Sequence, residues 1–321
     1  QGGTATQEIR IQITGSNDAP LITGGPDSAS LTENSSSPLA VTGSLTVGDV
    51  DTSDIVTASR TLAVSGGSNR SDPAAPSDAE LLAMFSLSPT AILDNTQTSN
   101  TLNWSFDAGS QTFDYLQAGE TLVLTYTVTA TDDNGTALAD SETVTLTITG
   151  SNDAPIITLL SQDSDSAALS ETNDSLSAQG TLTVGDVDRA DTVSPSVVSV
   201  VATGITTGLQ SNNAALLSML DVGNTAVIDN TATSGTIHWD FDSGSESFNH
   251  LAQGETLVLT YTVRASDSVT GVHEQTVVIT VTGNNDKPTL SIATPADFVE
   301  AGNAAAQSLS ATGSVAFADL D

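Results

Sequence analysis

The sequence repeats itself at a period of about 135 residues. The string SNDAP at 16–20 returns at 151–155, and a weaker form, NNDKP, stands at 284–288. The string GETLVLTYTV at 119–128 returns letter for letter at 254–263. Because an internal repeat of this length indicates one folded unit used several times, we expect a tandem array rather than one large core.

The repeat marks divide the 321 residues into four segments. Two complete units are expected at 21–155 and 156–288, each long enough for a single hydrophobic core. Residues 1–20 are interpreted as the C-terminal strand of a preceding repeat, and residues 289–321 as the start of a following one. We therefore expect this sequence to be a window onto a longer array.

Acidic residues dominate the charge, with 39 Asp and Glu against 6 Lys and Arg and a net charge of −33. Nucleic acid and anionic membrane surfaces both require a basic face, so neither is an expected partner. The apolar residues, 38% of the chain, fall in alternating runs that a disordered acidic chain lacks. A folded protein this acidic needs bound divalent cations, a salt-rich medium or both. The absence of cysteine excludes disulfides and thiolate metal sites, and no apolar run is long enough to insert into a membrane.

Most of each unit is predicted to be β-strand. The run TLVLTYTVTAT at 121–131 alternates apolar residues with Thr, which is typical of a strand with one buried face. About seven such strands per unit predict an all-β fold of tandem antiparallel β-sandwiches with immunoglobulin-like topology. Trp104 and Trp239 are expected in the two cores. One short helix per repeat is expected at 78–85 and 213–220. The other strands of the first unit are predicted at 21–31, 39–47, 55–64, 85–93, 101–106 and 142–149.

The alternating direction of the strands sorts the acidic turn residues to the two ends of a unit. GDVD at 48–51 and TDDNG at 131–135 are expected beside the incoming linker, whereas Glu33 and Glu120 are expected beside the outgoing one. Asp and Asn are common in turns for backbone reasons alone, but most of these acids recur in both copies. Asp114 becomes Asn249 and ranks lower for that reason. The candidate ligands from this placement are Asn17, Asp18, Glu33, Asp49, Asp51, Glu120, Asp132, Asn152, Asp153, Glu171, Asp186, Asp188, Glu255, Asp267 and, at the GDVD position of the following repeat, Asp319 and Asp321.

Carboxylates gathered this closely repel one another unless a cation lies between them. Oxygen ligands from flexible turns suit Ca²⁺, which accepts six to eight oxygens at about 2.3–2.6 Å, whereas Mg²⁺ demands a stricter octahedron. The sequence therefore predicts Ca²⁺ at the junctions between repeats.

Three motifs, TLTVGDVD, FxxLxxGETLVLTYTV and TxTITGSNDAP, together resemble the VCBS repeat family. Such repeats occur in very long bacterial surface and biofilm adhesins, many of them exported by type I secretion. The linker also resembles the DxNDNAP linker of cadherins, in which Asn and Asp bind Ca²⁺ between domains. This resemblance implies a cadherin-like sandwich and the same linker and DxD ligands, and it adds Asn285 and Asp286 to the candidates. Lys287 departs from the linker pattern and places a cation beside that third site.

The resemblance implies a calcium-rigidified stalk of a large, extracellular bacterial adhesin that acts in attachment and biofilm formation. Neighbouring repeats of the same chain are the expected partners, with other cell-surface or matrix molecules as further candidates. An enzyme is not expected, because His238, His250 and His273 have no histidine counterparts in the first unit. The alternative is a calcium-dependent carbohydrate- or protein-binding module, since the loops of β-sandwiches often carry such sites.

Overall fold

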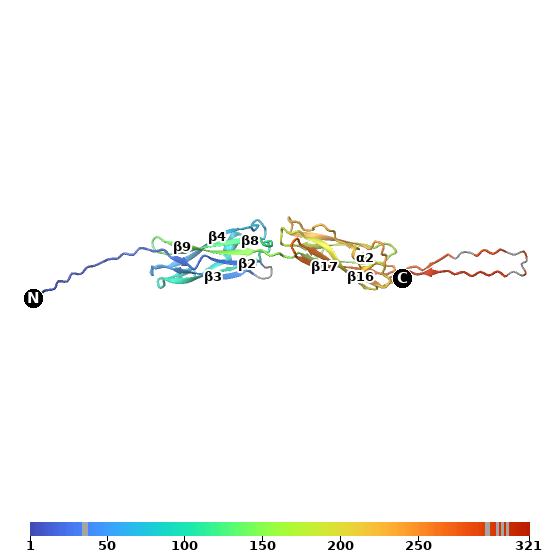
Figure 1. Cartoon of the computed structure of the whole chain (residues 1–321), viewed down its shortest axis with the longest axis horizontal. Helices are drawn as coiled ribbons and strands as arrows, with labels where there is room; N and C mark the ends of the chain where they lie inside the picture. The colour runs from blue at the N-terminus through green and yellow to red at the C-terminus, as the bar shows by residue number, and fades with distance from the viewer. Residues whose placement is uncertain (34–37, 293–295, 300–301, 303–304, 306–307) are drawn as a thin grey trace. The chain divides into compact units, whose positions relative to one another are not determined.

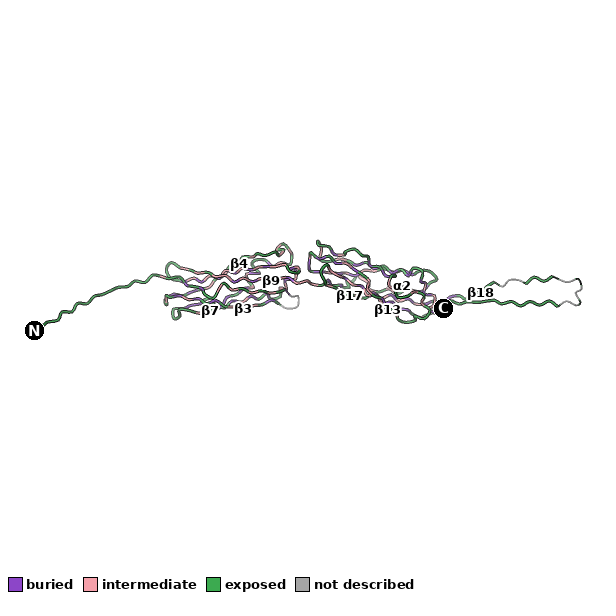
Figure 2. The backbone as a smooth tube through the Cα atoms, in the orientation of Figure 1, coloured by how far each residue is buried: buried purple, intermediate pink, exposed green. Residues whose placement is uncertain are grey.

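The computed structural model describes residues 1–33, 38–292, 296–299, 302, 305 and 308–321. The chain divides into two compact units, 1–153 and 154–321, and Figure 1 shows a layered β-structure in each. Each unit has its own cluster of buried apolar side chains. Figure 2 shows these buried residues inside the sandwiches and an exposed segment at the N-terminus. The predicted last strand of a preceding repeat falls on this segment, where residues 1–20 form no strand.

The first unit is a sandwich of two sheets with strand orders β1-β3-β7-β5 and β2-β9-β8-β4-β6. In this order the first strand is divided between the two sheets, and the remaining strands follow the immunoglobulin-like arrangement. All of the pairings are antiparallel except the parallel pair of β2 and β9. The predicted all-β fold class is therefore confirmed. The elements are β1 (Leu21–Thr23), β2 (Asp27–Thr32), β3 (Ala40–Gly48), β4 (Val56–Gly66), α1 (Asp78–Ala83), β5 (Phe85–Ser88), β6 (Ala91–Leu93), β7 (Ser99–Asp107), β8 (Thr121–Thr131) and β9 (Ala139–Thr149).

The second unit repeats this plan with sheets β10-β12-β15-β14 and β11-β17-β16-β13. Leu21 pairs with Gly48 in the first unit, and Ile156 pairs with Gly185 in the second. Thr289 pairs with Ala318 at the same repeat position, although part of 289–321 lies outside the described residues. The elements are β10 (Ile156–Thr158), β11 (Ser166–Ser170), β12 (Ser177–Gly185), β13 (Ser194–Gly204), α2 (Asn213–Leu217), β14 (Leu220–Asp221), β15 (Ser234–Asp242), β16 (Thr256–Ser266), β17 (Val272–Thr282), β18 (Thr289–Leu290) and β19 (Phe317–Ala318).

The apolar face of each sheet builds the core. In β8 every second residue is buried, as the alternation of apolar residues with Thr predicts. Trp104 is 2% exposed and Trp239 is fully buried, so both tryptophans occupy the predicted places. Phe85 stacks on Tyr126 with ring centroids 4.0 Å apart, which joins the two sheets of the first unit.

The helix of each unit is short and is tied to the core by a tyrosine. Ser77 caps α1, and its backbone N–H donates to Glu80 Oε2 at 2.7 Å in a capping box. The hydroxyl of Tyr126 donates to the carbonyl oxygen of Leu81 at 2.7 Å, and Tyr261 makes the equivalent bond in the second unit. Both helices end earlier than predicted. No helix within the described ranges is long and apolar enough to cross a membrane.

Two predicted strands are each divided in the structure. Strand 21–31 breaks at Gly24, which has a positive φ of 88°, so that β1 joins one sheet and β2 the other. Strand 85–93 breaks at Pro89, which has no N–H to offer a ladder, into β5 and β6 in opposite sheets.

Candidate metal centres at the poles of each unit

Each unit carries acidic side chains at both ends, and strand register places them there. The chain enters the first unit at Leu21, opposite Gly48 at the end of β3, and we call this end the N-pole. β9 leaves at Thr149, opposite Thr32 at the end of β2, and we call this end the C-pole. The backbone N–H of Glu33 donates to the carbonyl oxygen of Thr149 at 2.8 Å. Glu33 thus lies beside the outgoing linker, as predicted.

At the N-pole of the first unit, Asp49, Asp51 and Asp54 direct carboxylate oxygens toward one another, with the three atoms all within 4.8 Å. The turn is closed by the N–H of Asp51, which donates to Asp49 Oδ1 at 2.9 Å. Asp49 and Asp54 are 5% and 3% exposed, and Oδ2 of each is buried with no hydrogen-bond partner. Burial raises the pKa of Asp49, and repulsion from Asp54 and Asp51 adds to the rise. These two oxygens accept no hydrogen bond from the protein, so both are available as ligands to a cation.

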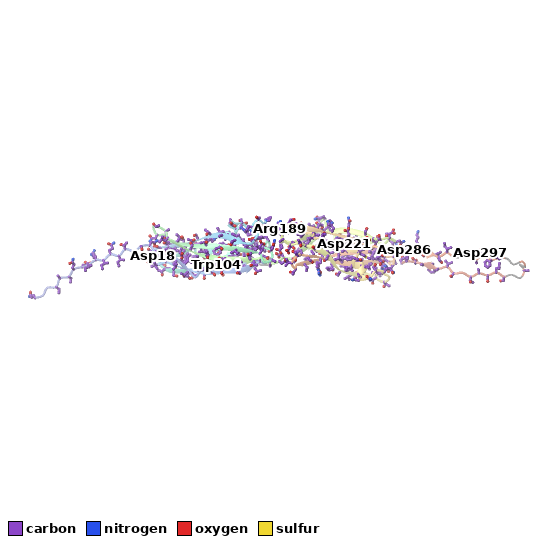
Figure 3. The ribbon with its side chains drawn as sticks, turned by 45° about the horizontal axis from the view of Figure 1, so that its top comes forward. Asp18, Trp104, Arg189, Asp221, Asp286 and Asp297 are labelled. Carbon is purple, nitrogen blue, oxygen red and sulfur yellow. The ribbon has the colours of Figure 1, made fainter. Side chains whose placement is uncertain are left out.

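The incoming linker lies on this pole. The N–H of Asp18 donates to Asp51 Oδ2 at 2.7 Å, and the side-chain amide of Asn17 donates to Asp132 Oδ2 at 3.1 Å. Asp132 is buried and accepts at its other oxygen from Leu138 N–H at 3.1 Å. Figure 3 labels Asp18 at this end of the first sandwich. The structure therefore brings together, within one unit, the predicted ligands of the linker (Asn17 and Asp18), of the turn after β3 (Asp49 and Asp51) and of the turn after β8 (Asp132).

The N-pole of the second unit also gathers carboxylates, from positions equivalent to Asp49, Asp54 and Asp132. Asp186, Asp191 and Asp267 form a group of carboxylate oxygens within 4.8 Å of one another, and Asp188 is 1% exposed. Burial raises the pKa of Asp186 to about 6, with smaller contributions from the charges of Asp191 and Asp267. Oδ2 of Asp186 and Oδ2 of Asp191 are buried without a hydrogen-bond partner. A hydrogen bond from the Ser268 hydroxyl to Asp191 Oδ1, at 3.1 Å, holds the turn.

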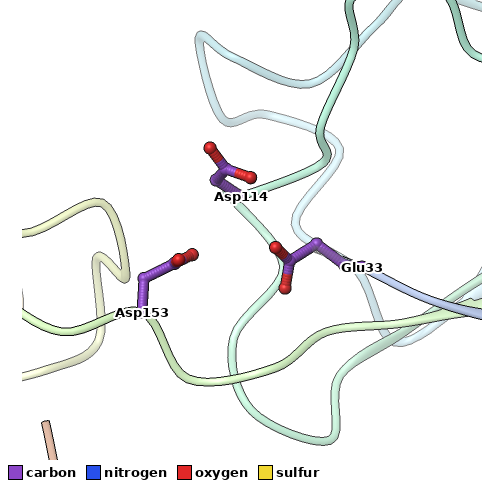
Figure 4. Close-up of side chains that lie close together, drawn as sticks. All are labelled: Glu33, Asp114 and Asp153. Carbon is purple, nitrogen blue, oxygen red and sulfur yellow. The ribbon is translucent and has the colours of Figure 1, made fainter. Parts of the chain in front are cut away.

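At the C-pole of the first unit, Glu33, Asp114 and Asp153 point toward one another in Figure 4. One carboxylate oxygen from each lies within 4.8 Å of the others. Glu33 is 2% exposed, and its Oε1 is buried and accepts no hydrogen bond. Oδ1 of Asp114 is likewise buried without a partner. These three carboxylates come from the end of β2, the β7–β8 connection and the linker.

The two glutamates that precede β8 and β16, Glu120 and Glu255, accept hydrogen bonds from backbone N–H groups. Glu120 accepts hydrogen bonds from the N–H groups of Asn69 at 2.8 Å and Gln117 at 3.1 Å, one at each carboxylate oxygen. Glu255 accepts from Ala252 N–H at 3.1 Å in the second unit. The structure thus uses these two predicted ligands to shape the connection and does not place Glu120 in the group with Glu33.

The C-pole of the second unit brings three chain segments together. Glu171 is 2% exposed, and burial raises its pKa, with repulsion from Asp286 and Asp321 adding to the rise. The N–H of Asp286 donates to Asp321 Oδ2 at 3.4 Å, as Asp18 does to Asp51 in the first unit. The pKa of Asp319 is raised because its protonated carboxyl can donate a hydrogen bond to the Asp321 carboxylate, and repulsion from Asp321 adds to the rise. Asn152 and Asn285 are the two remaining predicted linker ligands. The side-chain amide of Asn152 donates to the carbonyl oxygen of Asp153 at 3.1 Å, and that of Asn285 donates to the carbonyl oxygen of Asp286 at 2.7 Å.

Sequence reasoning did not name Asp54 and Asp191 and gave Asp114 a low rank, whereas the structure places all three in the groups of converging carboxylates. Asp54 and Asp191 stand at the same place in DVDTSD and DVDRAD, so a comparison of the two copies contains the signal. Asp114 was ranked low because its counterpart is Asn249. An amide oxygen is nevertheless also a calcium ligand, so this exchange keeps a ligand and removes a charge.

Two hollows elsewhere occur at matching places. One, of about 440 Å³, lies over β3, β5 and β7 and is lined in part by Gly43, Asn103 and Trp104. The other, of about 480 Å³, is lined in part by Gly180 and Trp239. Both indole rings are nearly or fully buried, so neither offers a face on which a sugar ring could stack.

No family model and no curated protein matches this chain. Similar solved structures include the extracellular domain of protocadherin gammaB4, which is 16% identical with a TM-score of 0.38 over 86% of this chain and 36% of that one. Mouse cadherin-23 EC22-24 is 15% identical with a TM-score of 0.37, covering 86% of this chain and 71% of its own. Protocadherin gamma B2 extracellular cadherin domains 1–5 are 16% identical with a TM-score of 0.38, covering 85% and 41%. This chain thus spans about a third of the protocadherin gammaB4 chain. Because these TM-scores are low, the fold assignment rests on the strand order and register given above.

Proposed function

We propose that this chain is a segment of an extracellular stalk whose repeats are stiffened by Ca²⁺ at their poles. The single observation that carries the proposal is the set of buried carboxylate oxygens without hydrogen-bond donors, found at both poles of both units. A buried carboxylate with no partner is costly, because its charge loses hydration without compensation. A bound cation removes that cost and part of the repulsion within each group.

Calcium fits these groups better than other common cations. The candidate ligands are carboxylate and amide oxygens carried by turns and by the linker, and the chain contains no cysteine. Such a flexible, all-oxygen set suits Ca²⁺. The negative charge of −33 gives a further reason for divalent cations to bind the folded chain.

The linkers explain why binding at the poles would stiffen an array. Asn17 and Asp18 contact the N-pole of the unit that follows them, and Ser151 contacts the C-pole of the unit that precedes it. The third linker contacts residues on both sides, because Asp286 lies near Glu171 and donates its N–H to Asp321, in the segment that we propose begins a following repeat. An ion held by such a linker would restrict the rotation of the chain where two repeats meet.

The assignment to a bacterial adhesin with a role in attachment and biofilm formation rests on the VCBS resemblance of the sequence motifs. Tandem units of one fold, with metal sites at their ends, suit projection of another domain away from a surface. The expected partners are the neighbouring repeats of the same chain, together with other cell-surface or matrix molecules.

Small-angle scattering and calorimetry test the proposal together. In millimolar calcium we expect heat of binding and a longer, narrower distribution of molecular lengths than in chelator. The double variant Asp186→Ala, Asp188→Ala should lose the change in length, whereas Asp221→Ala, at an exposed position of the edge strand β14, should keep it. A wild-type chain that gives no binding heat and no change in scattering would refute the stalk proposal. Calcium-dependent binding to a glycan array without a change in length would favour the alternative of a carbohydrate-binding module.

A further inference from the structure

We propose that the C-poles of the two units bind calcium with different affinities, because the first presents Asp114 where the second presents Asn249. This inference rests on the calcium binding proposed above and concerns how that binding is graded along the chain. The first C-pole is expected to fill at a lower calcium concentration than the second.

The two residues occupy the same structural position. Each follows a buried phenylalanine with a positive φ, 66° at Phe113 and 63° at Phe248, which is rare outside glycine. The loop that carries each residue is closed by the same backbone hydrogen bond. Gly119 N–H donates to the carbonyl oxygen of Gly150 at 3.0 Å, and Gly254 N–H donates to that of Gly283 at 3.0 Å. Because the backbones agree, the side chains of Asp114 and Asn249 are presented alike.

Both C-poles are built to hold a ligand. Oε1 of Glu33 and Oε1 of Glu171 are buried without hydrogen bonds, in side chains that are each 2% exposed. Oδ1 of Asp114 and Oδ1 of Asn249 are also buried and without partners. Four oxygens at equivalent places therefore lack donors in the protein. The two glutamates carry the same charge, whereas Asp114 is a carboxylate and Asn249 is a neutral amide.

Among the candidate ligand positions, the difference in charge between the two units lies at the C-poles. At the positions that a unit and its outgoing linker share, the first C-pole has the carboxylates of Glu33, Asp114 and Asp153, whereas the second has those of Glu171 and Asp286 with the neutral amide of Asn249. Asp321, from the segment after the second linker, also lies near Glu171 and is outside this comparison. Lys287 follows Asp286, where the first linker has Ala154. The nearby cation of the first unit, Arg70, is paired with Asp78 at 2.7 Å. Four candidate carboxylates of the N-pole turns recur in both units, Asp49, Asp51, Asp54 and Asp132 in the first and Asp186, Asp188, Asp191 and Asp267 in the second.

Ligand charge is one of the two main determinants of calcium affinity in oxygen sites. Replacing one carboxylate by an amide at fixed geometry should weaken binding by about tenfold, or ~1.4 kcal/mol. A rise in calcium would then order the linker after the first unit before the linker after the second.

A reciprocal exchange tests this inference in the full chain by calcium titration calorimetry. Asp114→Asn should weaken the tighter C-pole step about tenfold, and Asn249→Asp should strengthen the weaker step by a similar factor. The double variant Asp114→Asn, Asn249→Asp should regain two separated steps. Asp94→Asn, which removes the same charge from an exposed turn, should leave the titration unchanged.

The outcomes separate the two proposals. If wild type binds calcium but neither single exchange shifts a step, the graded affinity is wrong and the stalk proposal stands. If wild type binds no calcium, the proposed function fails first. A thermal melt in chelator shows whether each variant is folded. If Asp114→Asn does not fold, Asn249→Asp alone still tests the inference.

Discussion

Ser151 donates both its backbone N–H and its hydroxyl to the same oxygen of Glu33, Oε2, at 2.9 and 2.7 Å. The other oxygen, Oε1, is buried and accepts nothing. In the second unit Asn284 N–H donates to Glu171 Oε2 at 3.2 Å, and Oε1 of Glu171 again has no partner. The first residue of each linker thus orients the glutamate carboxylate at the C-pole. The same hydrogen bonds therefore hold both the linker and the glutamate oxygen that is available to a cation.

Glu33→Gln should separate the charge of this group from its hydrogen bonds. The amide oxygen can still accept from Ser151, so the variant should fold, but the C-pole loses one negative charge. We expect the rise in melting temperature on adding calcium to become smaller than in wild type. Glu274→Gln, in a half-exposed surface pair with Arg264, serves as the control and should retain the full rise. An unchanged rise in Glu33→Gln would remove Glu33 from the site.

Asp186 should make the metal-free protein less stable as the pH rises. Its folded-state pKa of about 6 lies above the ordinary value of 3.8 because burial disfavours the charged form. The folded state therefore binds the proton more tightly, and the contribution of Asp186 to stability falls between about pH 4 and pH 6. In chelator, Asp186→Asn should melt above wild type at pH 7 and lose that advantage near pH 4. Thermal melts across this range check the sign, and equal slopes for both proteins would contradict it.

Gly43→Ala should destabilise the first unit. Gly43 pairs with Trp104 across β3 and β7, and a Cβ there would overlap the indole ring. Overpacking of this kind costs about 1–3 kcal/mol. Gly180→Ala should have the same effect against Trp239. Urea denaturation measures both, with Gly67→Ala as a control in open space that should change the free energy of unfolding by less than about 0.5 kcal/mol.

Ser77→Ala should lower the free energy of unfolding of the first unit by about 1 kcal/mol. The variant leaves the N–H of Glu80 without its cap and breaks the capping box. Asn212→Ala tests the simpler cap of α2, where Asn212 Oδ1 accepts from Ala215 N–H at 3.0 Å. Denaturant melts of both variants should show two losses of similar size, and a negligible loss in either would mean that the cap does not limit unit stability.

The sandwich could be predicted because its signals are local. The alternation in β8 and the identity of GETLVLTYTV in both copies fix which faces are buried, and strand direction then sends Glu33 and Asp49 to opposite poles. The breaks at Gly24 and Pro89 were not predicted, because a change of sheet depends on which strand each half of the divided strand pairs with. Pattern alone does not contain that information.

The site was predicted only in part, for a related reason. Glu120 was a candidate ligand, and which backbone groups lie around a carboxylate depends on how the loops close. Here the loop brings the N–H groups of Asn69 and Gln117 to it. Asp54 joins Asp49 because the turn curls back on itself, with Asp54 N–H donating to the carbonyl oxygen of Asp51 at 3.1 Å. Sequence spacing did not specify that curl.

The parallel pairing of β2 with β9 decides how a unit would respond to being pulled by its ends. Tension reaches the unit through Pro20 ahead of β1 and β2, and leaves it through Gly150 after β9. The pull therefore runs along two neighbouring strands in opposite directions. The six residue pairs from Asp27–Val144 to Thr32–Thr149 are then loaded in shear, all at once, instead of being unzipped one after another. The same geometry recurs where β11 lies beside β17, so each repeat resists extension through a cooperative mechanical clamp.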